Sequence, residues 1–384
     1  MEKFEIDIPE SSIDDVRQRL RQTRWPSELG DNSDWSQGTS LAYLRELVDY
    51  WLSDYDWYAQ QQAMNAYDHF KCEIDGTRIH FIHAKGKGPA PMPLILNHGW
   101  PWTFWDFHKV IGPLCDPAAY GGDPADAFDV IVPSLPGYAF SNPVSRAGDC
   151  NFYRAAELWP KLMDRLGYDR FAVQGGDFGG MVAAFLGHKY PERVHGLYLN
   201  LIQAFSNPFP VSEDYAEEEK HWEQKNINFL NQSAAYLNLQ MTRPQTAAFA
   251  LHDSPVGLAS WLIEKRYEWS DCQGNIENCF SKDHLITTAM LYWLTESYVT
   301  SARYYYEAVM CMPAIDDSKL PIVSPPTAVL QFEKDNQPQP RRWAEKYYNL
   351  QHWKVADKGG HFAPMESPEL LVDDMRGYFR TLRN

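Results

Sequence analysis

Paired cysteines, long apolar runs and an excess of positive charge are all missing from this chain of 384 residues. Its six cysteines are scattered with no C-x-x-C pair, a pattern that favours free thiols in a reducing compartment over a disulfide framework or metal site. No run approaches the roughly 18 apolar residues of a membrane-spanning helix. The charged start, Met1 to Ile6, also has no apolar stretch typical of a signal or transit peptide. We therefore expect a cytoplasmic protein with no membrane span and no metal site.

The charge balance excludes further classes of partner. Lysine and arginine total 35 against 51 acidic residues, so the net charge is −16. Phosphate backbones and anionic membranes repel such a chain, and nucleic acid is not an expected partner. Hydrophobic residues make up 44%, which indicates a globular protein with a sizeable core. The 14 tryptophans and 22 tyrosines provide material for an apolar pocket. The composition leaves the oligomeric state open, and a homodimer is compatible with it.

The beginning of the chain has a helical pattern. Ser12 and Asp15 have the spacing of a capping box, which predicts a helix that starts at Ser12. The apolar face of that helix is Ile13, Val16 and Leu20. A second helix is predicted over 40–55. We expect residues 1–68 to form an N-terminal helical segment that packs on a core.

The core shows strand signals from residue 69 onward. Asp75–Gly76 separates two alternating runs and predicts a β-hairpin. Short, continuously apolar runs alternate with helical patterns further on, which predicts a mostly parallel sheet covered by helices on both faces. These runs are 94–96, 130–132, 171–173, 197–199 and 328–330.

A helical stretch interrupts the sheet pattern. Charged and helical sequence dominates 206–315, and strand signals resume only near Pro325. We therefore expect four parts: the N-terminal segment, a first part of an α/β core over 69–205, a helical lid over 206–315, and the second part of the core over 316–384.

The stretch Val173 to Val182, VQGGDFGGMV, has the pattern of a nucleophile elbow. A small residue, any residue, a nucleophile, any residue and a glycine follow an apolar strand and precede a helix. The sharp turn explains the glycines at 175, 176, 179 and 180, and it would expose Asp177 at the end of the sheet. The alternative is a glycine-rich turn in which the aspartate only caps the following helix.

Two further stretches favour the catalytic interpretation. His98-Gly99-Trp100-Pro101 follows a strand and would direct backbone N–H groups at a developing oxyanion, with His98 itself a structural turn residue. His361 lies on a glycine-rich loop near the C-terminus and is placed to act as a base. Glu333 and Asp335 are both candidates for the acid by position. The order nucleophile, acid, base is that of α/β-hydrolases.

The chemistry of an aspartate nucleophile narrows the reaction. Attack by a carboxylate on an ester only exchanges one acyl bond for a comparable one. Attack at an sp³ carbon instead gives an alkyl ester that activated water then hydrolyses. An epoxide would need an acid such as a lid tyrosine, which predicts an epoxide hydrolase. A halide would need only N–H donors, which leaves a dehalogenase as the alternative. A non-catalytic binding protein with the same fold is the third hypothesis.

Several motifs together resemble the microsomal-type epoxide hydrolases of the α/β-hydrolase superfamily, over nearly the whole chain. The motifs are Arg24-Trp25-Pro26, Tyr50 to Trp57, His98 to Pro101, Val132 to Tyr138, Gly175 to Asp177, Asp253 to Leu258, Leu291 to Trp293 and Gly359 to Phe362. The resemblance implies an α/β-hydrolase fold with an N-terminal segment that wraps round the core. It also implies a small hydrophobic epoxide and water as the reactants, without a cofactor or metal.

The same resemblance implies roles for individual residues. Asp177 would be the nucleophile and His361 the base. The acid would be Asp335 rather than Glu333, from its place three residues after Phe332 and eight before Trp343. The remaining positions are two lid tyrosines that activate the epoxide oxygen and two backbone N–H groups of an oxyanion hole, namely Tyr236, Tyr305, Trp100 and Phe178.

The chain departs from the family pattern at three places. Phe178 stands where tryptophan is usual, which should matter little because the expected role is through the backbone. Trp102 and Thr103 stand where Gly-Ser is common, and the bulky indole is expected to narrow or reshape the pocket. Glu333 and Lys334 add charge just before the expected acid. The physiological epoxide and the regio- and enantioselectivity are not encoded in these motifs.

Overall fold

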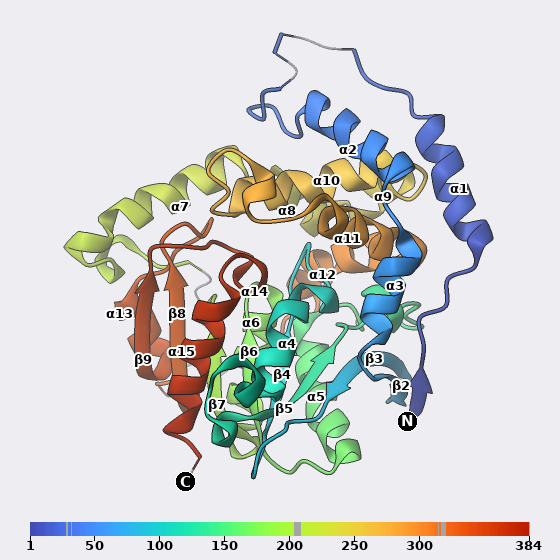
Figure 1. Ribbon diagram of the computed structural model, residues 1–384. Coiled ribbons are helices and arrows are strands. Elements are labelled where there is room, and N and C mark those ends of the chain that lie inside the picture. Colours follow the sequence, from blue (N-terminus) through green and yellow to red (C-terminus); the bar gives the residue numbers. More distant parts are fainter. Residues whose placement is uncertain (28–29, 32, 203–208, 314, 316–319, 384) are drawn as a thin grey trace.

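A nine-stranded sheet forms the centre of the computed structural model, which describes residues 1–27, 30–31, 33–202, 209–313, 315 and 320–383 (Figure 1). The strand order is β1-β2-β3-β5-β4-β6-β7-β8-β9. The strands are β1 (Glu2–Phe4), β2 (His69–Ile74), β3 (Thr77–Ala84), β4 (Met92–Asn97), β5 (Phe128–Pro133), β6 (Phe171–Gly175), β7 (Val194–Leu199), β8 (Val323–Phe332) and β9 (Tyr348–Ala356).

Pairing in the sheet changes from antiparallel to parallel along its width. Strands β1, β2, β3 and β5 pair antiparallel, whereas β5, β4, β6, β7, β8 and β9 pair parallel. The predicted hairpin is confirmed, since β2 and β3 pair on either side of Asp75–Gly76. All five predicted apolar runs lie in strands. Strand β1 was not predicted, because three residues are too few to show an alternating pattern.

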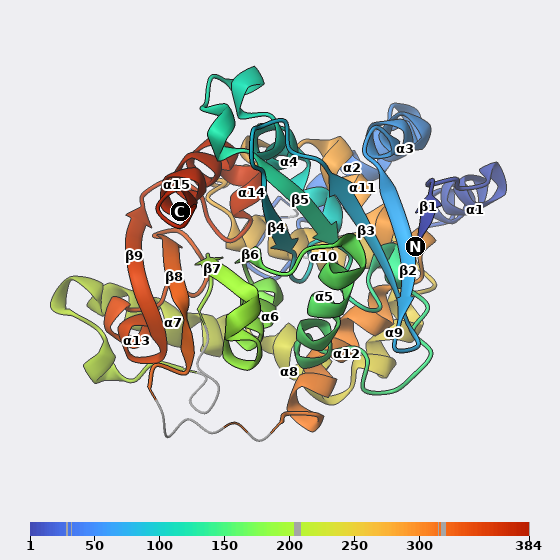
Figure 2. The same cartoon turned by 90° about the horizontal axis from the view of Figure 1, so that it is seen from below.

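Helices cover both faces of the sheet. Figure 2 shows α4 (His108–Cys115) and α15 (Pro368–Arg380) on one side and α5 (Phe152–Leu166) and α6 (Phe178–Lys189) on the other. Every residue of β5 and β6 is buried, as expected for parallel strands between two helical layers. The core also contains α13 (Arg341–Tyr347) beside β9 and the short α14 (Ala363–Glu366).

Six helices follow the first part of the core and lie across one end of the sheet (Figure 1). The expected boundary between 205 and 206 lies outside the described residues, and so does residue 316, where the second part of the core was expected to begin. The helices are α7 (Lys220–Gln232), α8 (Ala235–Thr242), α9 (Pro244–Leu251), α10 (Pro255–Trp269), α11 (Lys282–Leu294) and α12 (Tyr298–Met310).

The N-terminal segment connects the edge of the sheet to these helices. It contains α1 (Glu10–Arg21), α2 (Leu41–Ser53) and α3 (Trp57–Asn65). Helices α1 and α2 contact α10, and α2 also contacts α11. The Tyr50 hydroxyl donates to Asp283 Oδ1 at 2.9 Å, which ties α2 to α11.

The predicted start of the first helix at Ser12 is wrong. Helix α1 begins at Glu10, two residues earlier, and no side chain caps it. Pro9 precedes the helix in an extended conformation, and its carbonyl accepts a hydrogen bond from the Ser12 N–H at 3.0 Å. Because proline has its φ angle set by its ring, the chain enters the helix there without needing a serine cap.

Short 3-10 helices fill several of the connections. They are η1 (Phe104–Phe107), η2 (Pro117–Tyr120), η3 (Pro124–Asp126), η4 (Ala139–Ser141), η5 (Pro191–Arg193), η6 (Ser212–Asp214), η7 (Glu217–Glu219) and η8 (Ile276–Asn278). Within the described part of the chain, no helix has the length and apolar character needed to cross a membrane.

Candidate active site

The turn between β6 and α6 holds Asp177 in a strained backbone conformation. Its φ of 50° and ψ of −131° lie in a region that side chains disfavour. Glycine is required beside it, since a Cβ at Gly175 would lie 2.1 Å from the Gly179 carbonyl oxygen. A Cβ at Gly179 would lie equally close, 2.1 Å, to the Asn97 carbonyl oxygen. The glycines therefore allow β4, β6 and α6 to approach closely enough to present the carboxylate.

A backbone amide holds one oxygen of the Asp177 carboxylate. The Trp100 N–H donates to Oδ1 at 2.8 Å. Gly99 must lack a side chain, because a Cβ there would lie 2.3 Å from the same oxygen. Phe178 is the first residue of α6, so its N–H belongs to the free, positively polarised end of that helix. The two amides expected in an oxyanion hole thus flank Asp177.

His361 lies between two carboxylates. Its Nδ1 is 3.0 Å from Asp335 Oδ1, and its Nε2 is 3.4 Å from Asp177 Oδ2. Burial alone would lower the pKa of His361, but the charge of Asp335 and the contact with Asp177 outweigh it and raise the pKa to about 10. The imidazole is therefore protonated in the free protein. Any event that removes the charge of Asp177 would lower this pKa.

Glu333 and Asp335 have different partners in the structure. Glu333 contacts α7, where it accepts from Trp222 Nε1 at 2.9 Å and lies 2.6 Å from His221 Nε2. Asp335 is buried and contacts His361 instead. Because β8 ends at Phe332, the turn that follows sends the two side chains to different neighbours. Glu333 thus fastens a helix to the core, and Asp335 orients the imidazole.

Tyr236 and Tyr305 face Asp177 from α8 and α12, respectively. Their ring centroids are 5.9 Å apart, nearly perpendicular at 89°. Burial, reinforced by the charge of Asp177, raises the pKa of both hydroxyls well above the usual value, so both remain protonated. The Tyr236 ring stacks on Trp100 at 5.4 Å, and the Tyr305 ring contacts Phe178 at 4.6 Å. The side chains of the two expected oxyanion-hole residues therefore also position the tyrosines.

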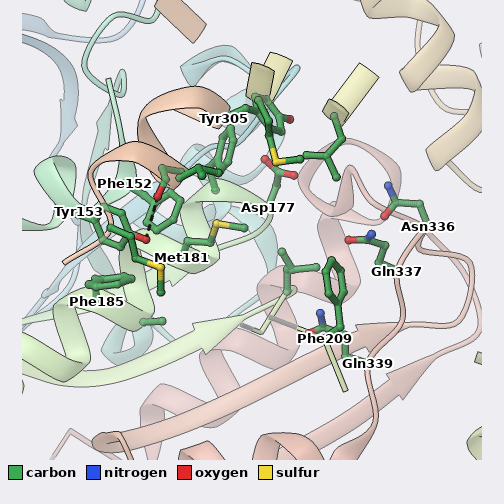
Figure 3. Close-up of a pocket in the computed structure, with 18 of the residues that line it drawn as sticks. Phe152, Tyr153, Asp177, Met181, Phe185, Phe209, Tyr305, Asn336, Gln337 and Gln339 are labelled. Atoms are coloured by element: carbon green, nitrogen blue, oxygen red, sulfur yellow. Dashed lines mark hydrogen bonds between the residues drawn. The ribbon is translucent and has the colours of Figure 1, made fainter. Parts of the chain in front are cut away.

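These groups share one cavity of about 470 Å³, shown in Figure 3. Asp177, His361, Tyr236 and Tyr305 all line it. Apolar side chains dominate the rest of the wall, with a few amides at one end. The remaining lining residues are Phe152, Tyr153, Phe178, Met181, Ala184, Phe185, Leu201, Phe209, Leu237, Met241, Ala308, Val309, Met312, Asn336, Gln337 and Gln339.

Trp102 does not line this cavity. Its fully buried indole lies edge-on to the His361 ring, with centroids 5.7 Å apart, and it also packs against Phe362. Gly176 gives it room, because a Cβ there would approach the indole to 3.2 Å. The indole therefore does not narrow the pocket from its wall, and any effect on the pocket's shape is indirect, through the support that it gives the histidine from behind.

A buried ion pair that the motifs did not indicate joins α10 to the turn after β4. Arg266 Nη1 is 2.6 Å from Asp106 Oδ1, and Arg266 Nη2 donates to the Pro101 carbonyl at 3.0 Å. Although burial opposes the charged form, Arg266 holds the pKa of Asp106 well below its usual value. His284 of α11 lies 3.4 Å from the same carboxylate. Partners separated by 160 residues leave no periodic signal in the sequence.

Glu366 is a second buried group that the sequence did not reveal. Its carboxylate accepts the N–H of Phe362 at 2.8 Å and that of Asp271 at 2.7 Å. Burial raises the pKa of Glu366 to about 7 despite these two donors. The carboxylate therefore joins the loop that carries His361 to the residues after α10. Among the described residues, no group of three or more histidine, cysteine or acidic side chains could hold a metal ion.

Known proteins that resemble this chain define its class and its family. Residues 92–368 match the family described as the alpha/beta hydrolase fold, and residues 1–107 match the one described as the epoxide hydrolase N terminus. A relative in Stigmatella aurantiaca is 40% identical over 99% of this chain and 85% of its own length. Epoxide hydrolase 1 of Oryctolagus cuniculus is 35% identical over 97% of this chain and 87% of its own length. This chain belongs to the epoxide hydrolase family.

Solved structures agree with that assignment. The Aspergillus niger epoxide hydrolase superimposes with a TM-score of 0.86 at 27% identity, covering 99% of this chain and 96% of the other. The juvenile hormone epoxide hydrolase of the silkworm Bombyx mori gives a TM-score of 0.87 at 29% identity, covering 100% and 95%. The predicted α/β-hydrolase fold is confirmed. Of the three predicted functions, hydrolysis of epoxides is the one that the relatives support.

Proposed function

We propose that the protein converts epoxides to vicinal diols through a covalent ester on Asp177. The observation that carries the proposal is the arrangement of three kinds of group around one cavity: a carboxylate, a histidine behind it and two protonated tyrosines. Asp177 Oδ2 attacks an epoxide carbon, and the bond from that carbon to the epoxide oxygen breaks. A proton from Tyr236 or Tyr305 neutralises the departing oxygen.

Ester formation prepares His361 to act as a base. The ester carries no charge, so one of the two carboxylates that keep the imidazole protonated is lost. We propose that His361 then gives up its proton while the tyrosinate regains one, which leaves the proton count unchanged. Neutral His361, oriented by Asp335, is then able to remove a proton from water.

Hydrolysis of the ester completes the cycle. Water attacks the Asp177 carbonyl carbon, and the oxyanion is stabilised by the N–H groups of Trp100 and Phe178. Collapse of this intermediate breaks the acyl–oxygen bond, and His361 returns the proton to the departing diol oxygen. The carboxylic acid that remains on Asp177 transfers its proton to His361, which restores the initial pair.

The cavity wall and the helices above it fit a small hydrophobic substrate. Three thioethers and several aromatic rings line the wall, among them Met181, Met241 and Phe152. We propose that the helical segment 206–315 acts as a lid, since it supplies both tyrosines. A cytoplasmic location remains part of the proposal, supported by six cysteines that are all free thiols.

Isotope labelling in a single turnover tests the covalent route. With enzyme in excess over an epoxide in ¹⁸O-enriched water, we expect the first diol to contain unlabelled oxygen from Asp177. The label should instead enter the Asp177 carboxylate, because water attacks the carbonyl carbon. Mass spectrometry of the diol and of the peptide that carries Asp177 measures both. Label in the diol of the first turnover would show that water attacks the epoxide directly.

The tyrosine pair predicts a selective effect on ring opening. We expect Tyr236→Phe and Tyr305→Phe each to slow ester formation by about 10- to 100-fold, and the double variant by more, because each removes one proton donor. Ester hydrolysis should change much less. Rapid-quench measurement of the ester separates the two steps. Tyr306→Phe is the matched control, because this neighbouring side chain is 38% exposed. Normal ester formation in the double variant would contradict the assignment.

A further inference from the structure

Of the three amide side chains that line the cavity, two have no part in the steps above and are not fixed by the fold in the way that the third, Gln339, is. Asn336 and Gln337 directly follow Asp335 in the turn after β8. Figure 3 shows their amide ends directed into the pocket from the side opposite Phe152 and Tyr153. We refer to Asn336 and Gln337 together as the amide arm. The cavity thus differs in chemistry at its two ends, with Asp177 between them.

The amide arm is available for a ligand. Among the described residues, the Asn336 Oδ1 is buried and has no hydrogen-bond partner. The Gln337 side chain is half-buried and also lines the cavity. Gln339, by contrast, is held in place, since its Oε1 accepts the Ile202 N–H at 3.1 Å. A buried oxygen without a partner is destabilising, so the Asn336 Oδ1 at the wall of a substrate cavity is suited to accept a hydrogen bond from a ligand.

The amide arm selects a neutral partner. A carboxamide offers both a donor and an acceptor and carries no charge. No lysine or arginine is among the described residues that line the cavity, and the charge of Asp177 offsets that of the protonated His361, so the cavity offers no net positive charge to an anionic group. Groups that match are an ester, an amide or a hydroxyl. The other end, with the rings of Phe152, Tyr153 and Phe185, fits an alkyl or aryl group.

We infer that the substrates are amphiphilic epoxides, with an apolar group against the aromatic end and a neutral hydrogen-bonding group bound by the amide arm. The epoxide lies between the two groups, at Asp177. This inference rests on the proposed function and adds the substrate class to it. It also predicts a single binding orientation for the substrate, because only one orientation places a matching group at each end of the cavity.

Matched substrates test the inference. Each pair consists of an epoxide with an amide-ended tether and its all-carbon isostere. The pairs form a series of increasing tether length, and a carboxylate-ended analogue is measured beside each pair. The measured quantity is the ratio of kcat/KM for the amide-ended epoxide to that for the isostere. We expect this ratio to peak at one tether length in the wild type and to fall there by about tenfold in Asn336→Leu and in Gln337→Leu. The carboxylate-ended analogue should be the poorest substrate.

Comparing the two substrates of a pair in the same variant separates an effect on substrate recognition from damage to the catalytic groups. Because Asn336 adjoins Asp335, a disturbed Asp335 would slow both members of a pair equally and leave the ratio unchanged. Gln224→Leu, which removes an exposed amide on α7, is the matched control and should keep the wild-type ratio.

Each outcome bears on one of the two proposals. Any of three results would overturn the amide-arm inference. The ratio could be unchanged in both variants, it could fall equally in the control, or it could be one or less in the wild type at every tether length. Turnover of the isosteres would still support the proposed function in those cases. Failure of the wild type to hydrolyse any epoxide of the series would instead overturn the proposed function itself.

Discussion

Asp177→Ala should lower kcat/KM for epoxides by more than about 10⁴-fold and abolish the covalent ester. Removal of a nucleophile from a catalytic set leaves only the contribution of binding and of the oxyanion hole, and losses of this size are typical. Asp177 has no substitute in the cavity, since Asp335 is buried behind His361 and is not among the lining residues. Steady-state rates and intact-protein mass spectra after incubation with an epoxide measure the two effects.

The fold should survive the Asp177→Ala substitution. Alanine keeps the Cβ and the backbone conformation of Asp177 and removes only a partly buried carboxylate, so we expect a melting temperature close to that of the wild type. Asp357→Ala is the matched control, because it removes an exposed carboxylate in the turn that precedes the His361 loop. It should keep wild-type turnover. A variant without Asp177 that is folded and still forms an ester would refute the nucleophile assignment.

His361→Gln should trap the intermediate. Attack by Asp177 on the epoxide does not need a base, so ester formation should proceed, whereas its hydrolysis should slow by about 10³- to 10⁴-fold. We expect one equivalent of ester per protein, with an added mass equal to the intact epoxide and located on Asp177. Peptide mapping locates it, and His252→Gln, on the exposed end of α9, is the control. An adduct on a different residue would falsify the assignment.

The dependence on pH supplies a second measurement for the same histidine. The base must be neutral, so hydrolysis of the ester should accelerate as pH rises through the pKa of His361 in the intermediate. That pKa should be below the value of about 10 in the free protein, because the ester has removed the charge of Asp177. Single-turnover rates between neutral and alkaline pH measure it in the wild type. The rise should be absent from His361→Gln, and its persistence there would assign the titration to another group.

Short-range sequence patterns predicted the structure correctly where residues adjacent in the chain determine it. The turn residues Asp75 and Gly76 alone indicate a hairpin, and the sheet pairs around them. The glycines beside Asp177 indicate the elbow, because larger side chains at these positions would clash with the backbone where the chain turns sharply. The first helix shows the limit of such signals. Ser12 has the right spacing for a cap, but the preceding Pro9 also permits a helix start, and the chain begins the helix earlier.

Tertiary contacts decided what short-range signals left open. Glu333 and Asp335 are two residues apart and equally plausible as the acid by position alone. Only the fold shows that the first binds α7 and the second contacts His361. Trp102 likewise looked like a pocket residue by its place in the motif. The turn after β4 carries its indole behind the histidine, a direction that depends on packing with Phe362.

The sequence by itself determined the class of fold, the order of the candidate catalytic residues and, through an aspartate in place of a serine, displacement at an alkyl carbon as the expected chemistry. These follow from local backbone geometry and from the reactivity of single side chains. The tertiary structure alone decided which groups meet: the buried Asp106–Arg266 pair, the Glu366 bridge and the two unlike ends of the cavity. Such contacts join residues far apart in the chain, so their energies depend on distances and burial that no short stretch of sequence contains.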